Sequence, residues 1–80
     1  MLNVLLNSSG QIEEGALYRR PDTGSVTETA EVLEVAEDKM GIPHVRFQLH
    51  VCRGTDARTE QRTLALDIFY QRYRERIYEG

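Results

Sequence analysis

The chain has 80 residues and a formal net charge of −3, with 40% hydrophobic and 29% charged residues. This length corresponds to one domain, residues 1–80, and the balance of apolar and charged residues argues against intrinsic disorder. The acidic net charge is the opposite of the strongly basic balance that is typical of nucleic-acid-binding domains.

Cys52 is the single cysteine, so an intrachain disulfide is excluded. This favours a reducing compartment, and we expect a cytoplasmic protein of the bacterial or general cytosol. The apolar run at 2–6 is too short for a signal peptide, and no basic residue precedes it. No stretch approaches the about 20 apolar residues of a transmembrane helix, so we expect a soluble protein with no membrane partner.

The N-terminal part predicts one short strand after an uncertain start. Residues 1–12 contain a turn-like Asn-Ser-Ser-Gly cluster at 7–10, so they form either an edge strand or a flexible arm. A first strand is expected at 16–20. The Pro-Asp-Thr-Gly sequence at 21–24 then has the chemistry of a tight turn, because proline presets φ and glycine accepts a positive φ.

Residues 25–36 predict a long second strand that is rich in valine and threonine. Its apolar phase changes midway, because Val26 and Val32 fall on one face whereas Leu33 and Val35 fall on the other. A sharp bend or a β-bulge allows both halves to face the same core. Such bent strands close small barrels, so the phase change favours a barrel over an open sheet.

The clearest pattern in the chain lies at 43–51, where apolar residues alternate strictly with polar ones. Alternation with a period of two predicts a half-buried strand of an antiparallel sheet. A polar loop at 37–42 precedes this strand, with Gly41 expected in the left-handed conformation and Pro43 opening the strand.

A second loop is expected at 53–58, because Gly54 and Asp56 are typical of turns. It leads into a fourth strand at 59–66. We expect this strand to bury Leu64 and Leu66 in the same core as the third strand.

The last segment predicts a C-terminal helix at 67–78 that is capped by Asp67. Phe69, Tyr73 and Ile77 recur at a spacing of four and would form its buried stripe. The alternative is a strand, because aromatic and charged residues also alternate here. Helix formers dominate the segment, so we favour the helix.

Four segments together resemble SH3-like small barrels, the group that includes the Tudor and KOW modules. They are residues 15–20, 30–33, 44–47 and 64–69, and the last also resembles small, uncharacterised bacterial barrel families. The resemblance implies a mainly β fold, a small antiparallel barrel of four to five strands with a short C-terminal helix.

Enzymatic and metal chemistry find little support in the sequence. His50 and Cys52 share a face of the third strand, the proximity that a cysteine–histidine dyad needs, but no oxyanion site or cleft accompanies them. With Asp56 they offer three zinc ligands without any of the usual spacings. Glycine-rich phosphate motifs are absent. We therefore expect no enzyme, no metal site and no cofactor.

Arginine is the most suggestive residue type, because residues 44–80 carry seven arginines against five acidic residues. Arginine contacts carboxylates and phosphates in a planar, bidentate manner. If neighbouring strands align, one basic surface forms with an aromatic ring for stacking. The predicted surface comprises Tyr18, Arg19, Arg20, Arg46, Arg53, Arg58 and Arg62, with Tyr70 as a second ring. The alternative, which the acidic composition favours, is a solvated face whose arginines pair with Glu28, Glu31 and Glu60.

These observations predict a noncatalytic binding module. Its partner would be an acidic segment of another protein or a nucleic acid, contacted through Arg46, Arg53 and Arg62. The alternative is a structural or oligomerisation protein that uses a strand edge and the C-terminal helix, an arrangement compatible with a homodimer. An enzyme that uses His50 and Cys52 is a third, weaker hypothesis.

Overall fold

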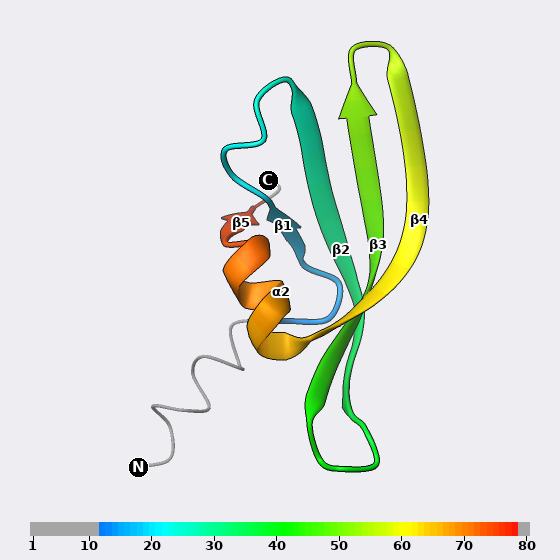
Figure 1. Cartoon of the computed structure of the whole chain (residues 1–80), viewed down its shortest axis with the longest axis vertical. Helices are drawn as coiled ribbons and strands as arrows, with labels where there is room; N and C mark the ends of the chain where they lie inside the picture. The colour runs from blue at the N-terminus through cyan, green and yellow to red at the C-terminus, as the bar shows by residue number, and fades with distance from the viewer. Residues whose placement is uncertain (1–11, 79–80) are drawn as a thin grey trace.

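The computed structural model describes residues 12–78, which form one antiparallel sheet of five strands and one short helix (Figure 1). The elements in chain order are β1 Leu17–Arg19, β2 Val26–Glu37, β3 Pro43–Arg53, β4 Asp56–Ala65, α2 Leu66–Arg72 and β5 Glu75–Ile77. The strand order is β4-β3-β2-β1-β5. The expected mainly β, antiparallel fold with a short helix is thus confirmed. The sheet is open within this range, so its closure into a barrel stays a prediction.

The predicted arm or edge strand at 1–12 lies outside the described residues, apart from Ile12. The side chain of Ile12 is buried in the core at 5% exposure. The predicted first strand and turn agree with β1 and the loop that follows it, in which Asp22 and Gly24 have positive φ angles of 60° and 66°. No helix of the described residues is long and apolar enough to cross a membrane.

The predicted bulge is present in β2. The pairing with β3 shifts between Val32 and Glu34, which leaves Leu33 without an opposite residue. Val32 is fully buried before the bulge, and Val35 packs against the same core after it, opposite Val45 of β3. The bulge therefore resolves the phase change by turning both halves of the strand toward one core.

The predicted third strand is confirmed, and the loop before it has Gly41 at a φ of 80°. The loop after it is shorter than predicted, because β4 begins at Asp56 and only Gly54 and Thr55 connect the strands. Gly54 has a φ of 59°, which is the conformation that a two-residue hairpin turn requires at its first position. The prediction of a loop at 53–58 is therefore wrong.

The predicted helix at 67–78 is also too long. Helix α2 ends at Arg72, and the chain continues as β5, which pairs with β1. Ala65 occupies the N-cap position, so Asp67 does not cap the helix and lies in its first turn. The hydrogen bonds that β1 offers at its open edge outweigh the helix propensity of the segment. The rejected alternative, a strand, is right for these last residues.

An aromatic cluster fills the core between α2 and the sheet. The ring of Phe69 on α2 lies 5.0 Å from Phe47 of β3, 5.1 Å from Tyr73 and 5.8 Å from Tyr18 of β1. Each of the four side chains is at most 4% exposed. We call the face of the sheet that carries this cluster and α2 the inner face, and the opposite one the outer face. The predicted stripe is thus confirmed for Phe69 and Tyr73.

Candidate functional site: an arginine groove

The pairing of β3 with β4 decides which face each arginine of the hairpin occupies. Directly opposite residues of an antiparallel pair project from the same face of the sheet. Arg62 lies opposite the core residue Phe47, and Arg58 lies opposite Val51. Both arginines therefore project from the inner face, although β4 carries few apolar side chains that could join the core.

A groove with a volume of ≈ 730 Å³ opens on the inner face beside the core. Its apolar lining includes Val26, Leu49 and Val51, which continue the core toward the β3–β4 hairpin. Five arginines surround this lining: Arg20, Arg53, Arg58, Arg62 and Arg72. We call this feature the arginine groove. A neighbouring hollow of ≈ 410 Å³ shares Arg20 and Arg72 with it and adds Arg74.

Most of the arginines around the two hollows lack a carboxylate partner. Within residues 12–78, ion pairs form between Arg20 and Glu28 at 3.4 Å and between Arg62 and Glu60. Glu28 and Glu60 were both expected to pair with arginines of neighbouring strands; the pair of Glu28 with Arg20 is of this kind, whereas Glu60 pairs with Arg62 of its own strand. Arg53, Arg58, Arg72 and Arg74 form none with any carboxylate in this part of the chain.

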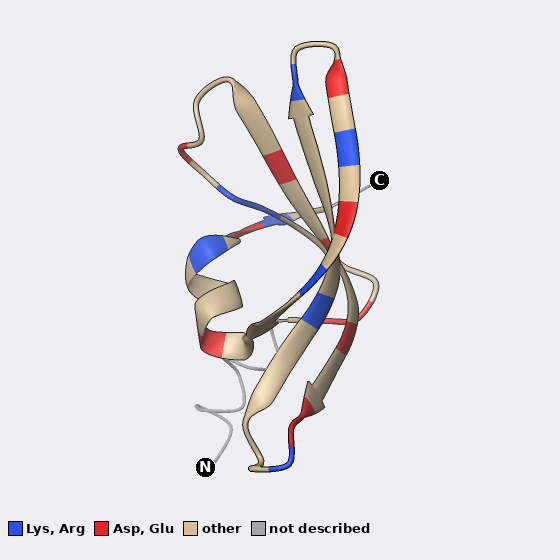
Figure 2. Ribbon diagram, turned by 45° about the vertical axis from the view of Figure 1, so that its right-hand side comes forward, with Lys and Arg blue, Asp and Glu red and all other residues tan. Residues whose placement is uncertain are grey.

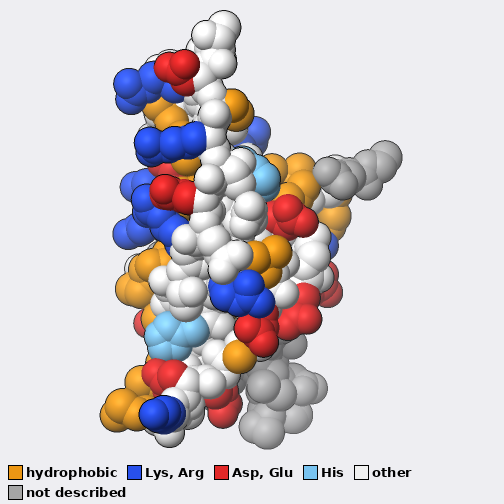
Figure 3. Space-filling model, turned by 90° about the vertical axis from the view of Figure 1, so that its right-hand side faces the viewer, with side chains coloured by type: hydrophobic (Ala, Val, Ile, Leu, Met, Phe, Trp, Pro, Cys, Tyr) orange, Lys and Arg blue, Asp and Glu red, His pale blue; other side chains and the backbone are white. Residues whose placement is uncertain are grey.

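The arginines elsewhere on the described surface are all paired. Arg19 lies 2.7 Å from Glu75, Arg46 lies 3.4 Å from Glu34 and Arg76 lies 3.1 Å from Glu13, measured between the nearest nitrogen and oxygen atoms. Figure 3 looks onto the outer edge of β4 and shows several basic side chains along one margin, with acidic ones between them, and further single ones elsewhere on this face. The arginines that lack a carboxylate partner among the described residues are therefore gathered around the two hollows.

The structure brings together four of the seven residues predicted for the binding surface: Arg20, Arg53, Arg58 and Arg62. Arg46 lies on the outer face because it alternates with buried Phe47 and Val45, and Arg19 lies outside because its neighbour Tyr18 points into the core. Tyr18 is 4% exposed, which corrects the expectation that its ring is available for stacking.

Arg72 and Arg74 were not among the residues predicted for this surface, and Arg58 and Arg62 were not predicted to lie on the inner face. The sequence signal that places Arg58 and Arg62 lies in the turn between β3 and β4. A two-residue connection at Gly54 and Thr55 sets Arg53 opposite Asp56, and the alternation along β4 then follows. The longer predicted loop concealed this register.

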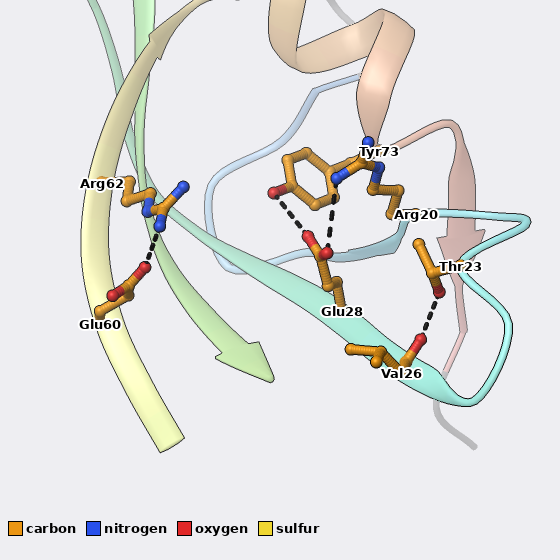
Figure 4. A network of polar contacts seen from close by, with 7 residues as sticks. All are labelled: Arg20, Thr23, Val26, Glu28, Glu60, Arg62 and Tyr73. Carbon is orange, nitrogen blue, oxygen red and sulfur yellow. Dashed lines mark hydrogen bonds and ion pairs between the residues drawn. The ribbon is translucent and has the colours of Figure 1, made fainter. Parts of the chain in front are cut away.

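One end of the groove is tied to the core by Glu28 (Figure 4). The hydroxyl of Tyr73 donates to one carboxylate oxygen of Glu28 at 3.3 Å, and Arg20 donates to the other at 3.4 Å. Burial, together with the nearby charge of Glu28, raises the pKa of Tyr73 above its ordinary value of 10.0. This contact fixes Glu28 and Arg20 against the end of α2.

His50 and Cys52 lie on the outer face, away from the groove. The Nδ1 atom of His50 is 3.3 Å from the Thr59 hydroxyl, its Nε2 atom is 3.6 Å from the Glu31 carboxylate, and Cys52 is exposed. Glu31, predicted as an arginine partner, thus lies beside a histidine. Among residues 12–78, no three histidine, cysteine or acidic side chains are grouped so that they could hold a metal ion.

The groove suits a ligand with both carboxylates and aliphatic groups. Guanidinium groups offer planar, paired donors to carboxylates, and the valine and leucine side chains between them offer an apolar surface. Its volume falls within the range of about 300–1,000 Å³ that is typical of ligand sites. A comparison of the chain with protein-family models, with curated proteins and with solved structures finds no match.

Proposed function

We propose that the protein is a noncatalytic binding module that holds an acidic segment of another protein in the arginine groove. One observation carries this proposal. Arg53, Arg58 and Arg72 border the groove without a carboxylate partner within residues 12–78, whereas Arg19, Arg46 and Arg76 on the remaining described surface are each paired. Unpaired guanidinium groups are available to a ligand without first breaking an internal ion pair.

Two properties of the groove favour a protein ligand over a nucleic acid. Its one aromatic lining residue, Tyr73, is 1% exposed and cannot serve as a stacking platform. The valine and leucine lining instead suits aliphatic side chains between the acidic residues of a peptide.

The proposal includes the SH3-like character of the domain and its cytoplasmic location. The antiparallel order of the strands, with a helical segment between β4 and β5, supports the first. A single, exposed cysteine supports the second, because a reducing compartment leaves such a thiol unpaired.

The proposal is tested by fluorescence anisotropy with a labelled peptide in which glutamate alternates with leucine. We expect Arg53→Ala and Arg72→Ala each to weaken binding by about five- to tenfold, as the loss of one exposed charge-assisted hydrogen bond predicts. Arg46→Ala is the matched control, since Arg46 is paired on the outer face, and it should change the affinity by less than about twofold.

Two results would contradict the proposal. Equal weakening by Arg46→Ala and Arg53→Ala would show that the peptide responds to total charge and not to the groove. Tighter binding of a single-stranded RNA than of the peptide, measured at the same moderate salt concentration, would assign the groove to nucleic acid.

A further inference from the structure

The outer edge of β4 is a long strand edge with no neighbour among the described residues. β4 spans Asp56–Ala65 and pairs on one side with β3, and no strand within residues 12–78 pairs with its other side. Arg53 and Asp56 flank the two-residue turn and so form a hydrogen-bonded pair. Such pairs recur at every second residue, so the even-numbered residues of β4 direct their backbone N–H and C=O groups toward β3. The odd-numbered residues therefore direct theirs outward: Ala57, Thr59, Gln61, Thr63 and Ala65.

Such an edge is a template for another strand. Of these five residues, all but the half-buried Ala65 are exposed, and none is charged. Figure 3 shows this edge as a mostly uncharged strip between margins of coloured side chains. Lysine, proline and a bulge, which commonly prevent pairing at edges, are absent from β4.

The inner-face side chains of β4 alternate in charge along the strand: Asp56, Arg58, Glu60 and Arg62 (Figure 2). Residues of this row that lie equally far from Thr59 on its two sides carry opposite charges. An antiparallel second copy that sets Thr59 opposite its own counterpart places Arg58 opposite Glu60 and Asp56 opposite Arg62. By symmetry each pair occurs twice, so every charged side chain of the row meets the opposite charge. Arg58 is then paired across the dimer, and Arg53 and Arg72 are the groove arginines that keep no carboxylate partner within residues 12–78.

The neighbouring registers are less favourable. With the twofold axis at Glu60, two glutamates face each other and Arg58 faces Arg62. With the axis at Gln61, Glu60 meets Arg62 but Arg58 meets Leu64. An acidic peptide that paired with this edge would place its carboxylates opposite Asp56 and Glu60, which would repel them. The charge pattern thus selects a second copy of this chain, in one register, over an acidic peptide.

We propose that the outer edge of β4 pairs with β4 of a second copy, antiparallel and with the twofold axis at Thr59. The two sheets then become one continuous sheet. The axis is perpendicular to that sheet, so both arginine grooves open on the same face. The ion pair between Arg62 and Glu60 of one chain (Figure 4) becomes part of a network that spans both copies. The contact is isologous, so it closes as a dimer and does not propagate.

The register is tested by disulfide cross-linking in a Cys52→Ser background. Opposite hydrogen-bonded residues have Cα atoms about 5.5 Å apart, within the range of a disulfide. Thr59→Cys should therefore cross-link under mild oxidation. Gln61→Cys is the matched control, because its two copies would lie about 13 Å apart in this register. Cross-linking of Gln61→Cys without Thr59→Cys would overturn the proposed register.

Charge exchange tests the contact itself by sedimentation equilibrium, without any peptide, and so independently of the groove's ligand. Arg58→Glu and Glu60→Arg should each raise the dimer dissociation constant at least about tenfold, because two attractive pairs become repulsive. An equimolar mixture of the two variants should form a heterodimer about as tight as the wild type, since each introduced charge meets its opposite.

Restored association in the mixture excludes misfolding of the single variants as the cause. A wild-type protein that stays monomeric up to about 1 mM, a concentration at which even weak specific contacts are occupied, would overturn the proposal. So would single variants that dimerise as tightly as the wild type.

Discussion

The replacement Tyr73→Phe tests the link between the core and the groove. It removes one hydroxyl and leaves the ring, which packs 5.4 Å from Phe47 and 5.1 Å from Phe69, in place. The hydroxyl donates to Glu28, which keeps its contact with Arg20 in the variant. The change therefore isolates one hydrogen bond at the end of the groove.

The magnitude follows from the geometry. A hydrogen bond to a charged group contributes about 1.5–3 kcal/mol to stability when both partners are buried. This bond is long at 3.3 Å, and the Glu28 side chain is 19% exposed, so we expect a loss of about 1 kcal/mol. For a domain of 80 residues this corresponds to a decrease in Tm of about 6 °C.

The pH dependence gives a second, independent signature. Burial and Glu28 raise the pKa of Tyr73 above 10.0 in the folded chain, so the folded state holds the phenolic proton more tightly than the unfolded state. The stabilisation is complete below pH 10 and is lost as the pH rises from 10 through the folded pKa. The difference in Tm between wild type and Tyr73→Phe should therefore shrink above pH 10.

Thermal unfolding followed by circular dichroism between pH 7 and pH 11 measures both effects. Tyr78→Phe is the control, because Tyr78 is 79% exposed, and we expect its Tm within about 1 °C of the wild type. Equal Tm values for wild type and Tyr73→Phe at pH 7 would show that the hydrogen bond between Tyr73 and Glu28 does not stabilise the fold. So would a difference between them that stays constant to pH 11.

Two further predictions concern the core and the β2–β3 loop. Phe69→Ala removes a fully buried ring and should lower the free energy of unfolding, measured with urea, by about 4 kcal/mol, which leaves this small domain largely unfolded at 37 °C. A loss of less than about 2 kcal/mol would contradict the packing described. The backbone N–H groups of Ile42 and Met40 donate hydrogen bonds to the Asp38 carboxylate and lower its pKa below the ordinary value of 3.8. The ionised carboxylate therefore stabilises the folded chain above pH 3.8, and this stabilisation is lost as the pH falls through the folded pKa. The Tm difference between wild type and Asp38→Asn should accordingly shrink below pH 4, and parallel pH profiles would contradict it.

Patterns that depend on a single strand or helix were predictable from the sequence. The alternation at 43–51 gave the third strand, because the period of two is imposed by the backbone itself. The phase change at Leu33 correctly indicated a bulge, since no regular strand satisfies both halves of that segment. The spacing of Phe69 and Tyr73 likewise identified two core residues without any tertiary information.

Features that depend on pairing were not predictable in the same way. Residues after Arg72 prefer a helix when considered alone, but the open edge of β1 turns them into β5. The composition around Gly54 fits either a long loop or a two-residue turn, and the register of β4 depends on which of them forms. The groove follows from that register, so the predicted basic surface shares Arg20, Arg53, Arg58 and Arg62 with it but includes residues of the outer face and omits Arg72.

The proposed binding of an acidic segment in the arginine groove can be followed by methyl NMR. The methyl groups of Val26, Leu49 and Val51 line the groove, whereas that of Ile42 lies in the β2–β3 loop. Titration with the glutamate–leucine peptide should shift the three groove valine and leucine signals, with smaller shifts at higher salt, and leave the Ile42 signal unchanged. Saturable shifts at Ile42 with none at the groove, or no shifts at any of these methyl groups at low salt, would contradict binding in the groove.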